Sequence, residues 1–156
     1  FFNILGPMIN PSSPKFQVLG VNNATNFDYY KTIYSKLDIK HSILNSLDGY
    51  DEVSLTSDVR IASKNKEIKL TPEDFGFNQI QPETLFGGES VEDAAKIFVS
   101  ILDGNGTTEQ NNVVLANAAL GINLVYPDKT LIECVSIARE SLESKSAFNK
   151  LKAIVE

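Results

Sequence analysis

One stretch of the chain constrains the fold more than any other: within residues 16–47, two apolar runs flank an amphipathic segment. Residues 16–21 (FQVLGV) and 39–47 (IKHSILNSL) have the length and the bounding turn residues of buried strands. The segment between them places five apolar side chains on one helical face: Phe27, Tyr30, Ile33, Tyr34 and Leu37, within residues 26–37. A strand, a helix and a strand in this length predict a βαβ crossover in a parallel sheet.

The chain changes character at residue 48, where the polar turn DGYDE begins. Residues 59–62 and 67–70 flank a polar tip at 63–66 and predict a β-hairpin. Residues 71–88 contain two prolines and three glycines, so we expect mostly irregular chain there, with one helical turn.

Three longer helices and a short amphipathic end are expected after residue 88. Ser90 with Asp93, and Thr130 with Glu133, have the spacing of capping boxes at the start of the first and third helices. The second, from about residue 107, is apolar nearly all round and should be the most buried. The apolar face of the first helix consists of Ala94, Ala95, Ile97, Phe98 and Ile101. The residues of the third helix predicted to face inward are Leu131, Cys134, Val135, Ala138 and Leu142. The fold class is therefore α/β, with a C-terminal helical set.

The charge and the cysteine content exclude some classes of partner and setting. The chain of 156 residues has 20 acidic against 14 basic side chains, a net charge of −6. It lacks the excess of basic side chains that binding to nucleic acids or anionic membranes requires, so we expect neither as a partner. Its one cysteine, Cys134, excludes an internal disulfide and suggests the reducing cytoplasm. No apolar run approaches the ~20 residues of a membrane span.

Asp51 and Glu52 are the strongest candidates for chemistry. They are adjacent carboxylates in a glycine-containing turn after a predicted strand. In α/β proteins, loops after the carboxyl ends of parallel strands bind ligands, and Mg²⁺ prefers one or two carboxylates together with phosphate oxygens. The alternative, which spacing alone favours, is a solvated acidic turn.

Two weaker candidates lie before the first predicted strand and near the start of the second. The Gly/Pro-rich loop that contains Asn10, Pro11 and Ser12 could line a pocket through its backbone, or could be a rigid corner between elements. His41, the only histidine, is predicted to be a surface or edge residue rather than a catalytic base.

Several segments, in order along the chain, resemble the anthranilate phosphoribosyltransferase family. Residues 2–11 (FNILGPMINP) are similar to the signature F-N-x-L-G-P-L-x-N-P, with Met8 where leucine is commoner. Residues 49–54 (GYDEVS) and 70–76 (LTPEDFG) resemble its G-x-D-E-[LV]-S and L-x-P-E-D-F-G segments. Shorter similarities follow at Gly87-Gly88, 101–104 and 117–119.

The resemblance implies a fold, a reaction and a set of site residues. The fold would be the large α/β domain of the nucleoside phosphorylase and phosphoribosyltransferase type. The reaction would transfer the phosphoribosyl group of phosphoribosyl pyrophosphate (PRPP) to the amine of anthranilate, in tryptophan biosynthesis. Asp51 and Glu52 match the acidic pair that ligates the Mg²⁺ accompanying PRPP. Pro11 and Ser12 correspond to a segment bordering the anthranilate tunnel.

The same resemblance implies that residues 1–156 are the C-terminal portion of the catalytic domain. The family's Gly-rich PRPP loop and the N-terminal helices through which it dimerises would lie before Phe1. We therefore expect the isolated segment to be inactive, with Phe1, Phe2 and Ile4 on an uncovered apolar surface. The alternatives are a non-catalytic binding protein with the transferase fold, a pyrimidine nucleoside phosphorylase, or an isolated structural fragment. The first would need a basic face, and the second would lack the pairing of 2–11 with 70–76.

Overall fold

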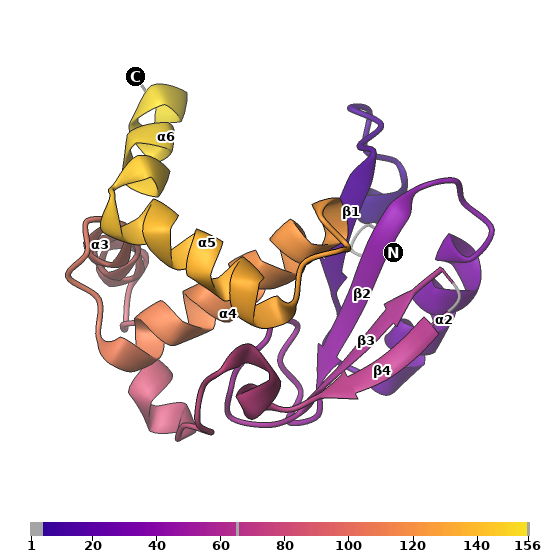
Figure 1. The fold of residues 1–156 in the computed structure, drawn as a ribbon, viewed down its shortest axis with the longest axis horizontal. Coiled ribbons are helices and arrows are strands. Elements are labelled where there is room, and N and C mark those ends of the chain that lie inside the picture. The colour runs from indigo at the N-terminus through magenta and orange to yellow at the C-terminus, as the bar shows by residue number, and fades with distance from the viewer. Residues whose placement is uncertain (1–4, 65, 156) are drawn as a thin grey trace.

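The described residues form a four-stranded sheet with helices on both faces (Figure 1). The structure is a computed structural model that describes residues 5–64 and 66–155. The predicted surface role of Phe1, Phe2 and Ile4 falls outside the described residues. The strands follow the chain order across the sheet: β1 (Phe16–Gly20), β2 (Lys40–Ser46), β3 (Val59–Ser63) and β4 (Lys66–Leu70).

The predicted βαβ unit is confirmed. Strands β1 and β2 pair in parallel, with Phe16 opposite Lys40 and Gly20 opposite Leu44, and helix α2 (Ala24–Tyr34) connects them. The helix begins two residues earlier than predicted because the side chain of Asn23 accepts a hydrogen bond from the amide of Asn26 and caps it.

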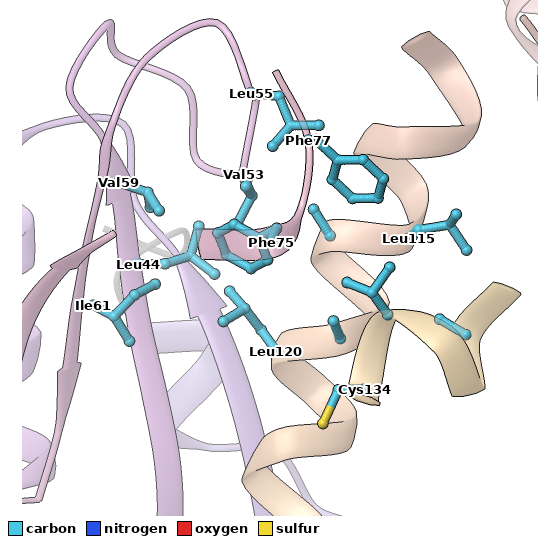
Figure 2. Packing of buried hydrophobic residues seen from close by; sticks show 14 of the residues in the cluster. Leu44, Val53, Leu55, Val59, Ile61, Phe75, Phe77, Leu115, Leu120 and Cys134 are labelled. Carbon is cyan, nitrogen blue, oxygen red and sulfur yellow. The ribbon is translucent and has the colours of Figure 1, made fainter. Parts of the chain in front are cut away.

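Strand β2 has buried side chains on both of its faces, so it divides the core in two. Ile43 packs toward α2, whereas Leu44 packs toward the opposite face. The smaller cluster, on the α2 side, comprises Val21, Phe27, Tyr30, Tyr34, Ile43 and Ala62. The larger cluster joins the other face of the sheet to helices α4 (Thr108–Val125) and α5 (Leu131–Glu143), as Figure 2 shows.

The hairpin is also confirmed, with β3 and β4 antiparallel and Val59 opposite Leu70. The segment after it forms two short 3₁₀ helices rather than the single helical turn predicted, η2 (Pro72–Phe75) and η3 (Pro82–Leu85). Pro72 and Phe75 are buried, and η2 packs against α5. This segment therefore contributes to the larger cluster although it has little regular structure.

Helix α4 is the most enclosed of the helices in residues 5–64 and 66–155, as predicted, since most of its side chains are buried or half-buried. The capping box of α5, Thr130 with Glu133, is present. The predicted inward residues of α5 are confirmed, and Cys134 is fully buried. No helix in the described part of the chain is both long and apolar enough to cross a membrane.

One apolar face is uncovered, and one prediction about burial is wrong. The apolar face of α3 (Val91–Leu102) is largely exposed, and Phe98 is 53% exposed. The reason is that α3 lies away from the sheet, beside α6 (Ser146–Val155) (Figure 1). His41 is buried rather than on a surface or edge, because β2 is an interior strand and the imidazole packs edge-on against the ring of Tyr34 at 5.2 Å.

Candidate functional site

Asp51 and Glu52 are exposed in the connection between β2 and β3. Because β1 and β2 are parallel, their carboxyl ends meet at this edge of the sheet. Gly20, the last residue of β1, lies against the backbone of Asp51: a Cβ on Gly20 would be 1.6 Å from the Asp51 carbonyl oxygen. The acidic turn therefore folds back across the end of β1, and only glycine permits this contact.

The turn is held by its own hydrogen bonds. The amide of Ser46 donates to the carbonyl of Tyr50 at 3.0 Å, and the amide of Gly49 donates to the carbonyl of Ser46 at 3.0 Å. Gly49 has a φ of +97°, which glycine adopts without strain. The hydroxyl of Ser46 donates to the carbonyl of Glu52. These bonds fix the backbone that carries both carboxylates.

A third carboxylate, Asp48, is occupied in supporting the turn. It accepts a hydrogen bond from the hydroxyl of Thr56, and the hydroxyl of Ser54 lies 3.5 Å from each of its oxygens. Leu55, between those two residues, is completely buried with a φ of +59°, a conformation that a leucine adopts only when its surroundings impose it. The strained backbone close to the acidic pair marks this loop as a candidate functional site.

Helix α4 contacts the turn through Asn117. Its side-chain oxygen accepts from the amide of Val53 at 2.9 Å, and its side-chain nitrogen donates to the carbonyl of the same residue at 2.9 Å. The same nitrogen also donates to the carbonyl of Val113, one turn back along α4, at 2.9 Å. The residue directly after the acidic pair is thereby attached to the most enclosed helix.

Asp51 affects the protonation of Glu52. Although Glu52 is an exposed residue, its pKa is raised, mainly because neighbouring protein atoms partly desolvate its carboxyl group, and then by the hydrogen bond and the negative charge of Asp51. A divalent cation between the two groups would relieve this repulsion. In the described part of the chain, no cluster of three or more ligating side chains forms. Two carboxylates without a third ligand suit Mg²⁺, which takes its remaining ligands from water and phosphate, and do not suit a structural zinc site.

The structure does not bring the two predicted sites together. Pro11 and Ser12 are exposed in the loop that leads into the first residue of β1, and the amide of Ser12 donates to the side chain of Asn10 at 3.0 Å. The acidic turn lies at the opposite end of the same strand, roughly 15 Å away for a strand of this length. A pocket of about 280 Å³ beside the loop is lined by residues that include Asn10, Ser13 and Gln17.

Tyr34 and Gln17 attach this loop to the core. The side-chain nitrogen of Gln17 donates to the carbonyl of Pro7 at 2.9 Å, and the hydroxyl of Tyr34 lies 3.0 Å from the side-chain oxygen of Gln17. Burial, together with the neighbouring Tyr30, raises the pKa of Tyr34, whereas the bond to Gln17 lowers it. Tyr34 therefore remains a neutral donor at physiological pH.

We expect Tyr34→Phe to lower the free energy of unfolding by about 1 kcal/mol, because one partly buried hydrogen bond is lost while the ring packing is retained. Amide hydrogen exchange in residues 7–15 should become faster. Urea unfolding and exchange mass spectrometry would measure both effects, with Tyr29→Phe on the exposed side of α2 as the control. Unchanged exchange in the loop would show that Tyr34 does not hold it.

Gly20 and Asn117 were not predicted as parts of the site. Each left a signal in the sequence: a glycine ending an apolar strand, and an asparagine within an otherwise apolar helix face. Neither signal identifies the contact, because both contacts are distant in sequence. Gly20 lies 31 positions before Asp51, and Asn117 lies 64 positions after Val53.

The fold and this turn define the class of protein. Residues 1–148 match the family described as "Glycosyl transferase family, a/b domain", and the chain belongs to it.

Its relatives give the particular enzyme that the sequence resembles. The chain is 46% identical to an anthranilate phosphoribosyltransferase of Bacteroides thetaiotaomicron and 44% identical to one of Bacteroides fragilis. Each match covers 156 residues, 100% of this chain and 47% of the relative. The chain therefore spans about half the length of the curated relatives it matches.

Solved structures agree on the fold. The anthranilate phosphoribosyltransferase of Thermus thermophilus superposes with a TM-score of 0.85 at 29% identity, covering 97% of this chain and 46% of that one. The Saccharomyces cerevisiae enzyme in complex with PRPP and Mg also gives 0.85, at 24% identity, covering 97% of this chain and 44% of that one. The predicted fold class and the resemblance are both confirmed.

Proposed function

We propose that this chain is the C-terminal portion of the α/β domain of an anthranilate phosphoribosyltransferase. The full-length protein would transfer the phosphoribosyl group of PRPP to the amine of anthranilate, giving N-(5-phosphoribosyl)anthranilate and pyrophosphate, in tryptophan biosynthesis. One observation supports this most: Asp51 and Glu52 occupy a hydrogen-bonded turn at the carboxyl ends of two parallel strands. The chain that carries them is 46% identical over its whole length to an enzyme of that name.

Asp51 and Glu52 are proposed to hold the Mg²⁺ that accompanies PRPP. The bond that breaks joins C1 of the ribose to a pyrophosphate oxygen, the bond that forms joins C1 to the anthranilate nitrogen, and that nitrogen then loses a proton to solvent or a base. Negative charge builds on the departing pyrophosphate, and a divalent cation held by Asp51 and Glu52 would supply the positive charge that stabilises it. The acidic turn contributes by fixing two carboxylate oxygens at a constant position, so that little ordering is needed when the ion binds.

Pro11 and Ser12 stay predictions from the resemblance, as walls of the anthranilate tunnel. They lie at the other end of β1 from the acidic turn, so a role in acceptor binding would require the tunnel entrance to be distant from the metal. The relevant test is whether a bulky substitution, Ser12→Trp, raises the KM for anthranilate and leaves the KM for PRPP unchanged.

We further propose that the full-length enzyme is a homodimer assembled through its N-terminal helices and works in the cytoplasm. Cys134, the single cysteine of these 156 residues, is buried and unpaired with another thiol, which is consistent with a reducing setting. The substrates themselves suffice as partners, and neither nucleic acid nor membrane is needed for this chemistry.

Anthranilate fluorescence tests the proposed reaction. With the full-length protein, we expect the fluorescence to decay only when both Mg²⁺ and PRPP are present. We expect no decay with purified residues 1–156 alone. A folded full-length protein that consumes no anthranilate under these conditions would show that the acceptor is a different amine.

A further inference from the structure

We infer that Asn117 is a positioning residue that sets the affinity of the acidic turn for its divalent cation. This inference rests on the proposed metal role of Asp51 and Glu52. Asn117 is not itself a ligand: its three hydrogen bonds all go to backbone groups, two of them on Val53 and one on Val113.

The chemistry at this position requires a carboxamide. Val53 presents one donor and one acceptor to α4, and the Asn117 side chain presents one acceptor and one donor in return, both at 2.9 Å. Its second N–H reaches Val113, so both donors of the amide are used. Aspartate at this position would keep the acceptor and lose both donors, and alanine would lose all three bonds.

The hydrogen bonds of Asn117 act on the part of the turn that carries the carboxylates. Val53 is 1% exposed and directly follows Glu52, and Figure 2 shows it beside the residues that join the sheet to α4. On the other side of the pair, the backbone of Asp51 rests against Gly20. The two carboxylates therefore lie between a fixed strand end and a fixed helix.

Helix α4 is rigid enough to serve as the reference. Leu115, Ala116, Ala119 and Leu120 are buried in the larger cluster, on either side of Asn117 in the sequence. Mg²⁺ accepts only near-octahedral arrangements at short distances, so a turn free to move would have to be ordered when the ion binds. The hydrogen bonds of Asn117 order the turn before the ion binds, so less conformational entropy is lost on binding.

Asn117→Ala in the full-length protein tests the inference. We expect the dissociation constant of Mn²⁺, measured by water-proton relaxation in the presence of PRPP and without anthranilate, to rise about tenfold, equivalent to about 1.4 kcal/mol. The Mg²⁺ concentration for half-maximal activity should rise similarly, while kcat at saturating Mg²⁺ falls by a smaller factor. Amide exchange in residues 50–54 should become faster.

Asn123→Ala is the matched control. Asn123 lies on the same helix, and its side chain donates to the carbonyl of Lys129 at 2.8 Å, away from the turn. We expect its Mn²⁺ affinity to equal that of the wild type. A folded Asn117→Ala with wild-type Mn²⁺ affinity, or an equal loss in Asn123→Ala, would overturn the inference.

A variant that fails to fold and a wild-type protein that fails to bind Mn²⁺ each have a defined consequence. If Asn117→Ala does not fold, Asn117→Asp, which keeps the acceptor for the Val53 amide, should bind Mn²⁺ severalfold more weakly, and unchanged binding overturns the inference. If the wild-type protein itself binds no Mn²⁺ with PRPP, the proposed metal role fails and the inference falls with it. If the wild-type protein binds Mn²⁺ and the Asn117 variants bind it with the same affinity, the positioning role of Asn117 is refuted and the proposed metal role stands.

Discussion

Asp51→Asn and Glu52→Gln are each expected to lower the kcat/KM of the full-length protein by about 100-fold or more. Each substitution keeps the shape of the side chain and removes one negative charge from the proposed metal site. Loss of a single preorganised group that stabilises developing charge costs about 10²–10³ in rate, and here the ion as well as the group is affected. Steady-state kinetics over a range of Mg²⁺ concentrations would measure the loss, and higher Mg²⁺ should restore part of it.

Asp128→Asn provides the control for charge removal, because Asp128 is exposed in the connection between α4 and α5, outside the acidic turn. Its kinetics should match the wild type. Wild-type kinetics in both Asp51→Asn and Glu52→Gln would show that the pair is a solvated acidic turn, the alternative that spacing alone favoured.

Gly20→Ala is expected to have the largest effect on stability, lowering the free energy of unfolding by about 3 kcal/mol, the upper end of the usual cost of overpacking. The added Cβ would lie 1.6 Å from the carbonyl oxygen and 2.6 Å from the carbonyl carbon of Asp51, and both atoms are backbone. Either the end of β1 or the acidic turn must move. Mn²⁺ affinity in the presence of PRPP should therefore fall together with stability, which urea unfolding would measure.

Gly121→Ala is the matched glycine control. Gly121 lies inside α4, and an added Cβ would meet no atom within 4 Å other than its chain neighbours and the backbone of its own helix. Alanine is preferred over glycine in a helix by about 0.5–1 kcal/mol, so this variant should be slightly more stable than the wild type. Equal stability of Gly20→Ala and the wild type would show that the turn accommodates the Cβ without displacement.

Local signals in the sequence were sufficient wherever the physics is local. The alternation of apolar runs with a helical stripe predicted β1, α2 and β2, because side-chain periodicity follows directly from backbone geometry. The capping box of Thr130 and Glu133 located the start of α5, since both partners lie within one helical turn. Asp51 and Glu52 were identifiable as a candidate for a similar reason: they lie together in the short turn that follows a strand.

The errors come from contacts between distant parts of the chain. The apolar stripe of α3 is real, but periodicity does not specify which element covers it, and Phe98 remains exposed in this chain. His41 is polar enough to suggest a surface, and its burial depends on Tyr34 and on the position of β2 between two other strands.

By itself, the sequence determined the βαβ unit, the hairpin, the capped helices, the acidic pair and the family resemblance. Only the tertiary structure showed that Gly20 and Asn117 hold the acidic pair from two sides, and that Pro11 and Ser12 lie at the far end of β1. The physical reason is range: periodicity and capping are set within about one turn of chain. A glycine 31 residues before Asp51 and an asparagine 64 residues after Val53 reach the turn only through packing of the sheet against α4.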